Sequence, residues 1–408
     1  MLNNIKFRLK KVKLIFKLNA FFKSKLFDIK LKKIENYYFN KKNSKINYKY
    51  NNDKVLELVK KNLSRKLNID NSSINSPNIL FAGTNEFQDK IIIRGLEKIG
   101  HVDTIIRDNG KYGLHSMPLN PKNVLYDKKT ILRNSEILLE NIESVSKKKI
   151  IHILVGQFWA NYLTKEIVKK IKIMGIIVIN ISMDDMLPEH WSFYGDIKLG
   201  SIGLASEIDF TLSTTKKCCE YYFLDNCPAF YWPLASDPEI FTNYNAYNKK
   251  ELDVIFVGAC YGIRKELVSY LLENHIKVEA YGGGWTNGYI SPSKTARLFQ
   301  KSKIILGLGT IGYSSKHYTL KCRDFDAPMS GSLYITHRNK DLKSLYIENV
   351  EAVFYKDKFE CLKKIKYYLN NDAEREQIAK KGQIRAQNDH TFEIRFKEMI
   401  NIIRRALP

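Results

Sequence analysis

A cluster of acidic residues and a histidine follows the apolar run 175–181. It reads Ser182-Met-Asp-Asp-Met-Leu-Pro-Glu-His190, so Asp184, Asp185 and His190 are close in sequence. A carboxylate or imidazole at the end of a strand can take the proton of a substrate hydroxyl. An aspartate in a loop can also cap a helix, and for either aspartate this role is as well supported as catalysis. The pattern predicts Asp184, Asp185 and His190 as the candidate catalytic group.

Glycines follow several apolar runs in the C-terminal half. Gly258 ends one run, Gly283 is the middle of three consecutive glycines, and segment 307–316 joins glycines to Ser314, Ser315 and Lys316. Glycine lets backbone N–H groups approach a phosphate, and a helix N-terminus adds a favourable dipole. Arg264 is expected near the start of such a helix. Any one of these loops could be an ordinary turn, but several in one domain favour a phosphate site.

Short apolar runs that alternate with amphipathic segments must position these residues. The first series predicts strands at 78–84, 102–107, 150–155, 175–181 and 209–213, with helices at 86–99 and 160–174. The second predicts strands at 254–258, 278–281, 304–308, 332–336 and 352–355, with helices at 263–274, 293–301, 358–369 and 373–385 and a last helix at 392–405. Continuous apolar strands separated by helices indicate an α/β fold with parallel sheets covered on both faces.

We therefore expect two Rossmann-like, doubly wound domains that face an interdomain cleft. The predicted divisions are a basic amphipathic extension at 1–75, an N-terminal domain at 76–245, a C-terminal domain at 246–390 and a docking helix at 391–408. Ligands of open parallel sheets bind beyond the carboxyl ends of the strands. Gly83, Thr84 and Gln157 follow strands of the first domain, so we expect them on the acceptor side of the cleft.

Charge is concentrated at the N-terminus. The net charge is +24, and residues 1–70 hold 20 basic and 5 acidic residues, which leaves +9 for the rest. In this segment Lys and Arg alternate with Leu, Ile and Phe, a pattern that suits an anionic membrane surface. A solvated extension or a helix packed on the main body is equally well supported. Nucleic-acid binding would rest on charge alone, so we expect no specific nucleic-acid partner.

Cysteine usage and hydropathy bear on location. The six cysteines form no C-x-x-C pair, no apolar run reaches the ~18 residues of a spanning helix, and no signal-peptide pattern opens the sequence. We expect reduced thiols in a cytoplasmic protein. The basic segment also allows the protein to lie peripherally at the inner face of the membrane. Hydrophobic residues at 44% and aromatic residues at 12% exclude wholesale disorder.

The C-terminal third resembles the CgeB-like (spore-maturation-type) glycosyltransferases. The resemblance rests on Arg323-Asp-Phe-Asp-Ala-Pro-Met-Ser-Gly-Ser-Leu, on Glu351-Ala-Val-Phe-Tyr and on Asp389-His-Thr-Phe-Glu-Ile-Arg395. It is good over about 253–405, looser over 78–215 and absent over 1–70. The resemblance implies the GT-B fold, with the donor nucleotide sugar in the C-terminal domain and the acceptor mainly in the N-terminal domain.

The same resemblance assigns roles to donor-side residues. Asp326 matches an acidic residue that would accept hydrogen bonds from ribose hydroxyls, although the family usually has Glu there. Arg323 would neutralise a diphosphate or brace Asp326. Ser314, Ser315 and Lys316 fall where related enzymes hold the diphosphate or the sugar hydroxyls.

These observations predict a glycosyltransferase that moves a sugar from a nucleoside diphosphate to an acceptor hydroxyl. Fixed N–H dipoles and cations can stabilise a diphosphate leaving group, so no metal or other cofactor is expected. The acceptor would be a glycan, lipid-linked or protein hydroxyl, and surface glycan or lipopolysaccharide assembly would fit a basic membrane-facing segment. The alternatives are a nucleotide-sugar epimerase and a non-catalytic binding protein of the same fold.

Overall fold

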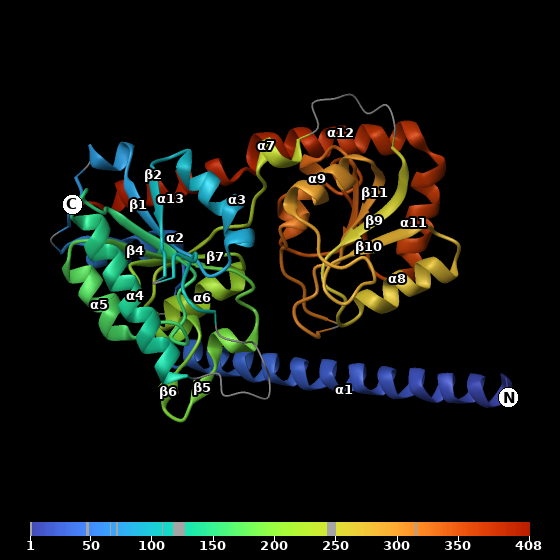
Figure 1. The fold of residues 1–408 in the computed structure, drawn as a ribbon, viewed down its shortest axis with the longest axis horizontal. Helices are drawn as coiled ribbons and strands as arrows, with labels where there is room; N and C mark the ends of the chain where they lie inside the picture. Colours follow the sequence, from blue (N-terminus) through green and yellow to red (C-terminus); the bar gives the residue numbers. More distant parts are fainter. Residues whose placement is uncertain are drawn as a thin grey trace. The chain divides into compact units, whose positions relative to one another are not determined.

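The computed structural model describes residues 2–45, 49–65, 67–70, 72–107, 109–116, 127–242, 250–314 and 316–408, and for residues 2–20, 87 and 88 it describes the backbone alone. The chain forms two compact units, which Figure 1 colours by sequence. The six-stranded unit comprises Tyr38–Phe241 and Ile384–Pro408. The five-stranded unit comprises Thr242–Gln383 together with the N-terminal residues through Tyr37.

The six-stranded unit is built on a fully parallel sheet. Its strands are β1 (Asn78–Ala82), β2 (His101–Thr104), β3 (Ile153–Gly156), β4 (Ile177–Ser182), β7 (Phe210–Ser213) and β8 (Ala229–Tyr231). They lie in the order β2-β1-β3-β4-β7-β8, with register pairs such as Phe81–Val155 and Val155–Ile179. The order reverses direction between β1 and β3, which is therefore the switch point of this sheet.

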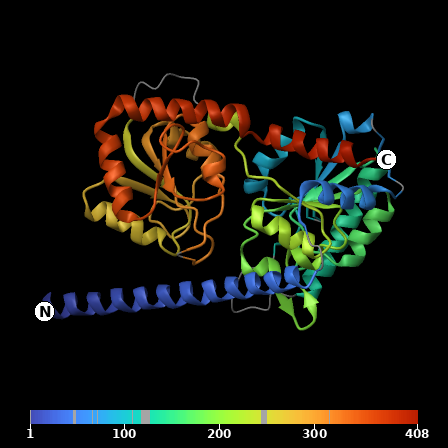
Figure 2. The same ribbon diagram turned by 180° about the vertical axis from the view of Figure 1, so that it is seen from behind.

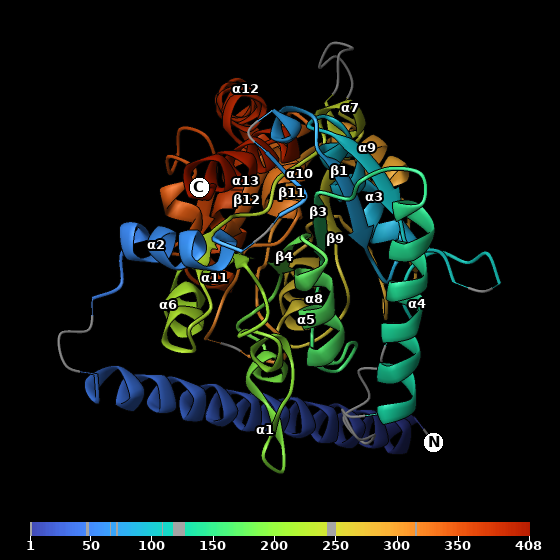
Figure 3. The same ribbon diagram turned by 90° about the vertical axis from the view of Figure 1, so that its left-hand side faces the viewer.

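Helices cover both faces of this sheet. Helices α2 (Asn52–Leu63), α3 (Glu86–Glu97) and α13 (Phe392–Ala406) pack together, and the red α13 and blue α2 can be followed in Figure 2. Val59, Leu96 and Phe396 from these helices join Phe81 and Ile179 of the sheet in one buried core. Helix α5 (Lys165–Ile173) packs on β4 and beside α4 (Lys128–Ser146), and Figure 3 shows α4 and α5 close together.

Shorter elements complete the unit. They are η1 (Ser73–Asn75), η2 (Pro188–Trp191), the hairpin β5 (Phe193–Tyr194) and β6 (Ile197–Lys198), η3 (Ser201–Gly203), α6 (Lys216–Leu224) and α7 (Pro238–Phe241). Elements η2 to η3 follow the carboxyl end of β4, so they form the surroundings of the predicted catalytic cluster.

The five-stranded unit repeats the same plan. Its strands are β9 (Leu252–Val257), β10 (Val278–Tyr281), β11 (Ser302–Leu306), β12 (Leu333–His337) and β13 (Val353–Tyr355), in the parallel order β10-β9-β11-β12-β13. Its helices are α8 (Arg264–Glu273), α9 (Pro292–Gln300), α10 (Arg323–Met329), α11 (Lys358–Asn370) and the first part of α12 (Asp372–Asp389), with η4 (Leu342–Ser344) before β13. Phe256, Leu306 and Ile335 of the strands are buried with Leu271 and Ile365 of the helices. The switch point lies between β9 and β11.

Helix α1 (Leu2–Asn43) begins in the five-stranded unit and ends in the six-stranded unit. At its C-terminal end the Tyr38 ring stacks on Tyr221 at 4.2 Å, and its hydroxyl donates to Asp225 Oδ2 at 2.6 Å. Lys41 Nζ reaches Asp225 Oδ1 at 2.5 Å, and Lys198 Nζ reaches the same oxygen at 3.0 Å. These hydrogen bonds hold the pKa of Asp225 below its usual value, although burial opposes them. This end of α1 is thus built into the six-stranded unit.

The predicted α/β fold with two parallel-sheet domains is confirmed, but the divisions between its parts differ. Residues 1–75 do not form one separate extension, because Val59 and Leu63 of α2 are fully buried in the six-stranded core. Helix α4 lies between the predicted strands at 102–107 and 150–155, where no helix was predicted. Helix α13 supplies core residues of the six-stranded unit, and the division between the units falls within α12. The predicted boundary near 245 falls outside the described residues.

Candidate donor and acceptor sites

The loops that follow β9 and β11 form the switch point of the five-stranded sheet. Two buried arginines meet there. Gly258, directly after β9, has φ +156°, and a Cβ at this position would lie 2.8 Å from Arg323 Nη1 and 3.5 Å from Arg264 Nη1. At this φ, a side chain here would press against the Arg323 guanidinium, so glycine suits the close approach of this group to the backbone. The side chains of Arg264 and Arg323 are predicted donor-site residues, and the fold brings them together.

Each arginine joins the two switch-point loops. Arg323 donates from Nη1 to Val257 O at the end of β9 and from Nη2 to Leu308 O after β11, at 3.0 Å for the second bond. Arg264 donates to Ala259 O at 3.2 Å and to Thr310 O at 3.5 Å, again one carbonyl from each loop. The two loops are thus held together by two guanidinium groups.

Aromatic rings and burial complete the surroundings of this arginine pair. The Arg264 guanidinium lies 4.1 Å from the Tyr261 ring centroid, and that of Arg323 lies 4.7 Å from the Phe256 centroid. Both residues are buried, at 4% and 7% exposure. Arg323 Nε is a buried donor with no acceptor in the described part of the chain. A buried donor of this kind suits an anionic oxygen, because desolvation strengthens a charge-assisted hydrogen bond.

The triple-glycine loop after β10 packs against the loop that follows β9. Gly282, with φ +121°, lies so close to the Gly258 carbonyl that a Cβ would sit 2.7 Å from it. Gly283 O accepts from Cys260 N at 2.7 Å, and Trp285 Nε1 donates to Gly258 O at 2.7 Å. The structure therefore places Gly283 against the arginine loop, where its carbonyl is already used.

The loop 309–316 is held from outside by α1. The buried Ser314 hydroxyl accepts from the N–H groups of Lys316 and His317, at 3.1 and 3.0 Å, and donates to Asp28 Oδ1 at 2.5 Å. The Lys316 side chain is exposed, and Ser315 falls outside the described residues. Sequence reasoning placed Ser314 toward the donor but gave no sign of its partner Asp28, which is 286 residues earlier in the chain.

Helix α10 carries two buried carboxylates. Asp326, the predicted ribose contact, is 8% exposed. Asp324 is more deeply buried and accepts hydrogen bonds from Tyr334 Oη at 2.5 Å and Lys321 N at 2.6 Å. Burial raises the pKa of Asp324 above its usual value, while these bonds and Arg323 oppose the rise. Asp324 is a residue that sequence reasoning missed, since its neighbour Asp326 matched the family pattern instead.

Two thiols are reachable near these loops. Cys260 in the β9–α8 loop is partly exposed, and Cys322, directly before Arg323, is exposed. Cys218, Cys219, Cys227 and Cys361 are buried.

The predicted acceptor-side residues follow β1 and β3, at the switch point of the six-stranded sheet. Gly83 and Thr84 come directly after β1, and the partly buried Gln157 comes directly after β3. The Gly83 Cα is covered by Asp89 and by the Tyr112 hydroxyl, which would both lie within 2.2 Å of an added Cβ. Asp89 accepts from the N–H groups of Thr84 and Asn85, both at 3.0 Å, so it fixes the shape of this loop.

The predicted catalytic group divides into one accessible and two buried residues. Asp184 is partly exposed and has the left-handed φ of +54°. Asp185 is fully buried, accepts from Ser213 Oγ at 2.5 Å, and has its pKa raised by burial to about 7. His190 is 1% exposed, its Nδ1 lies 2.7 Å from Ser201 Oγ, and burial lowers its pKa to about 3. Burial separates the last two from an acceptor hydroxyl, so their contacts favour a structural role.

Trp159 is a second residue that sequence reasoning missed. It follows β3 by three residues, is partly exposed, and its ring lies 4.2 Å from the His190 ring. An aromatic face at the carboxyl edge of a sheet provides a flat apolar surface for a ligand. The signal in the sequence was the aromatic pair Phe158-Trp159, which follows the strand end at Gly156-Gln157.

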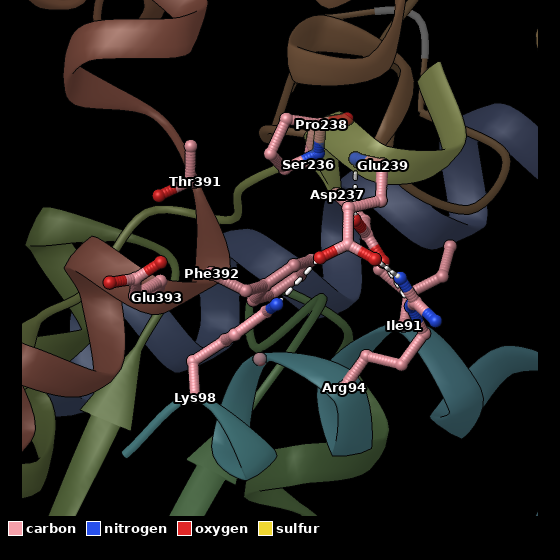
Figure 4. A pocket seen from close by; sticks show the side chains of 11 residues that line it. Ile91, Arg94, Lys98, Ser236, Asp237, Pro238, Glu239, Thr391, Phe392 and Glu393 are labelled. Carbon is pink, nitrogen blue, oxygen red and sulfur yellow. Dashed lines mark hydrogen bonds and ion pairs between the residues drawn. The ribbon is translucent and has the colours of Figure 1, made fainter. Parts of the chain in front are cut away.

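A small cavity of about 100 Å³ in the six-stranded unit is a charged junction (Figure 4). Arg94 donates to Asp237 Oδ2 at 2.6 Å and also to Glu239, which Lys98 Nζ reaches at 2.5 Å. The segments around Ser236 and Thr391 pair beside it. Because the charged side chains that line this cavity pair with one another, we assign it a structural role rather than a binding role.

Among the described residues, no three potential metal ligands of the His, Cys, Asp and Glu types gather at one place. None of the helices in the described part of the chain combines the length and apolar character that crossing a bilayer requires.

Comparison with known proteins places part of the chain in a described family. Residues 264–401 match the family described as "Glycosyl transferase-like". No curated protein sequence matches the chain significantly.

Solved structures share the fold at low identity. Sucrose-phosphate synthase from Thermosynechococcus elongatus is 11% identical with a TM-score of 0.56, and the match covers 81% of this chain and 98% of that one. HepE from Anabaena, in complex with UDP-glucose, is 10% identical with a TM-score of 0.54 over 79% and 99%. A glycosyltransferase from Rickettsia africae is 10% identical with a TM-score of 0.56 over 81% and 99%. The fold is therefore GT-B. The glycosyl transferase-like match over residues 264–401 supports the predicted sugar transfer over the epimerase and binding-protein alternatives.

Proposed function

We propose that the arginine pair at Gly258 binds the diphosphate of a nucleotide-sugar donor. The observation that carries this proposal is that Arg264 and Arg323 lie on the same side of Gly258 at the β9/β11 switch point and that both donate to carbonyls of its two loops. Ligands of open parallel sheets bind beyond such a point. The pair brings two fixed positive charges and a buried Nε donor to that place.

In the proposed reaction, the acceptor oxygen forms a bond to the anomeric carbon of the sugar. The bond between this carbon and the diphosphate oxygen breaks, and the electron pair leaves with the diphosphate. Arg264 and Arg323 stabilise the charge that grows there, an effect that is strongest in a buried site. Asp184 is the accessible carboxylate of the predicted catalytic group, so we assign it to receive the proton of the acceptor hydroxyl.

The finer assignments extend this proposal. Within the glycosyltransferases we place the chain in the CgeB-like group, on the motifs from Arg323 to Arg395. Asp326 would bind the ribose, and Ser314, Ser315 and Lys316 would lie near the diphosphate or the sugar. The acceptor would be a hydroxyl of a glycan, a lipid-linked sugar or a protein, in surface glycan or lipopolysaccharide assembly. HepE was crystallised with UDP and glucose, so UDP is the first nucleotide to test.

Thermal unfolding with UDP, GDP, dTDP and CMP tests the donor site, because a ligand that binds only the native state raises the midpoint. We expect one nucleotide to raise it. Arg264→Lys should abolish the shift, while Arg375→Lys, a change at another buried arginine of the same unit, should keep it. An unchanged shift in Arg264→Lys would reject the assignment.

A further inference from the structure

The inner face of α1 contacts the loop that follows β11. A Cβ on Gly312 would lie 2.4 Å from the Phe27 ring, so ring and backbone touch directly. Asp28 accepts the Ser314 hydrogen bond, and Lys23 Nζ lies 5.4 Å from the Tyr313 ring centroid. All these residues belong to the five-stranded unit. Helix α1 therefore fixes the loop from Gly312 to Ser314 on one side.

The opposite face of the same helix carries an exposed apolar line. Phe22, Leu26 and Ile29 are 64%, 57% and 48% exposed, and their spacing of four and three residues aligns them. At about 100° per residue, this line points away from Phe27 and Asp28. Three large apolar side chains in one row are unusual on a surface that meets only water.

Lysines flank this apolar line. Lys25, Lys30, Lys32 and Lys33 are exposed, whereas Asp28 and Glu35, the acidic residues of 1–45, are partly buried on the inner side. Against these two, residues 1–45 contain 14 basic residues. An apolar row between cations suits a bilayer, where the row enters the acyl boundary and the cations meet anionic headgroups. Nucleic acid would use the cations but leave the apolar row in water.

We infer that the Phe22–Leu26–Ile29 face of α1 docks on an anionic bilayer surface, and that this contact stabilises the loop from Gly312 to Ser314. The two contacts use opposite faces of one helix, so both can form at once. A bilayer that restrains α1 also restrains Phe27 and Asp28, and each contact then favours the other by linkage. The membrane contact and its effect on the loop stand apart from the proposed function; only a role of this loop in donor binding rests on that function.

Vesicle binding of the full-length protein tests the surface. We expect sedimentation with vesicles of phosphatidylglycerol and phosphatidylcholine, weakening with salt, and none with pure phosphatidylcholine. Phe22→Glu should weaken binding about tenfold or more, while Phe39→Glu is the matched control, because Phe39 is also 64% exposed but lies off the apolar line. Equal losses in both variants, retention on DNA without vesicle binding, or no binding at all would overturn the proposal.

Hydrogen exchange tests the coupling and needs no nucleotide. Anionic vesicles should slow amide exchange in the loop from Gly312 to Ser314 by about tenfold. In Asp28→Ala this slowing should disappear while vesicle binding remains. Loop exchange that vesicles leave unchanged in the wild-type protein would overturn the coupling. A protein that passes both tests but binds no nucleotide would disprove the donor assignment alone.

Discussion

The two switch points of this protein share a strand order but differ in chemistry. Between β9 and β11 the polar groups are two buried arginines, which bind the carbonyls of both loops. At the β1/β3 switch point the corresponding buried group is the carboxylate of Asp89, which binds two backbone N–H groups. The same topology thus supplies cations at one sheet and a carboxylate at the other. Only the first arrangement suits an anionic ligand, so fold alone does not decide which sheet binds the donor.

The largest expected effect is at the arginine pair. Arg323→Lys should keep a positive charge but lose the planar fork that joins Val257 and Leu308. We expect kcat/KM to fall about 1,000-fold, the upper range for loss of a group that stabilises a developing charge. Steady-state kinetics with donors that carry the nucleotide identified by thermal unfolding measures this. Activity within threefold of wild type would remove the contrast between the two switch points.

A smaller loss is expected at the accessible carboxylate of the other sheet. Asp184→Asn should lower kcat about 100-fold with little change in donor affinity, because the base acts on the acceptor. Binding of the nucleotide should stay intact in the same preparation. A rise in KM with unchanged kcat would instead assign Asp184 to acceptor binding.

The buried neighbour Asp185 should affect stability. Its folded pKa of about 7 is above the usual 3.8, so folding favours the protonated form. This contribution is complete below pH 4 and is lost as the pH rises toward 7, by up to about 1.4 kcal/mol per pH unit. Between pH 4 and pH 8, the free energy of unfolding measured in urea should therefore fall less for Asp185→Asn than for the wild-type protein.

The exposed Asp196 supplies the control for this measurement. Asp196→Asn should follow the wild-type pH profile. If Asp185→Asn also follows it, Asp185 is ionised in the folded protein and belongs again with the candidate bases.

The smallest effect is expected from metal removal. Since Arg264 and Arg323 supply the positive charge at the proposed diphosphate site, EDTA should change turnover by no more than about twofold. Full loss with EDTA, restored by Mg²⁺, would show that the arginine pair is insufficient for the leaving group.

Much of the fold could be predicted from the sequence because parallel strands are continuous apolar runs. The run at 78–84 contains β1, the run at 254–258 overlaps β9, and glycine marked the ends of both strands. The N-terminal region was harder to interpret, since repeated lysines hide the apolar spacing of Val55, Val59 and Leu63 that places α2 in the core. The charge pattern alone therefore left a membrane-facing surface, a solvated extension and a helix packed on the main body equally supported.

The sequence identified many residues of the candidate sites but not their contacts or their burial. Arg264 and Arg323 were named from loop position and resemblance, but their meeting at Gly258 depends on a strand order that no local pattern contains. Burial of Asp185 and His190 was also hidden, because it depends on tertiary contacts: Ser213 donates to Asp185, His190 contacts Ser201, and Trp191 of η2 packs on Tyr222. Asp28 could not have been linked to Ser314 without the fold.

The reachable thiols offer a chemical report on the donor loops. A maleimide added to the native protein should modify Cys322 first and Cys260 more slowly, since burial raises the pKa of Cys260 and keeps its thiol protonated. Both flank the arginine pair, whereas the remaining four cysteines are enclosed. Mass spectrometry of the labelled protein can therefore follow occupancy of these loops directly, without knowledge of the sugar or of the acceptor.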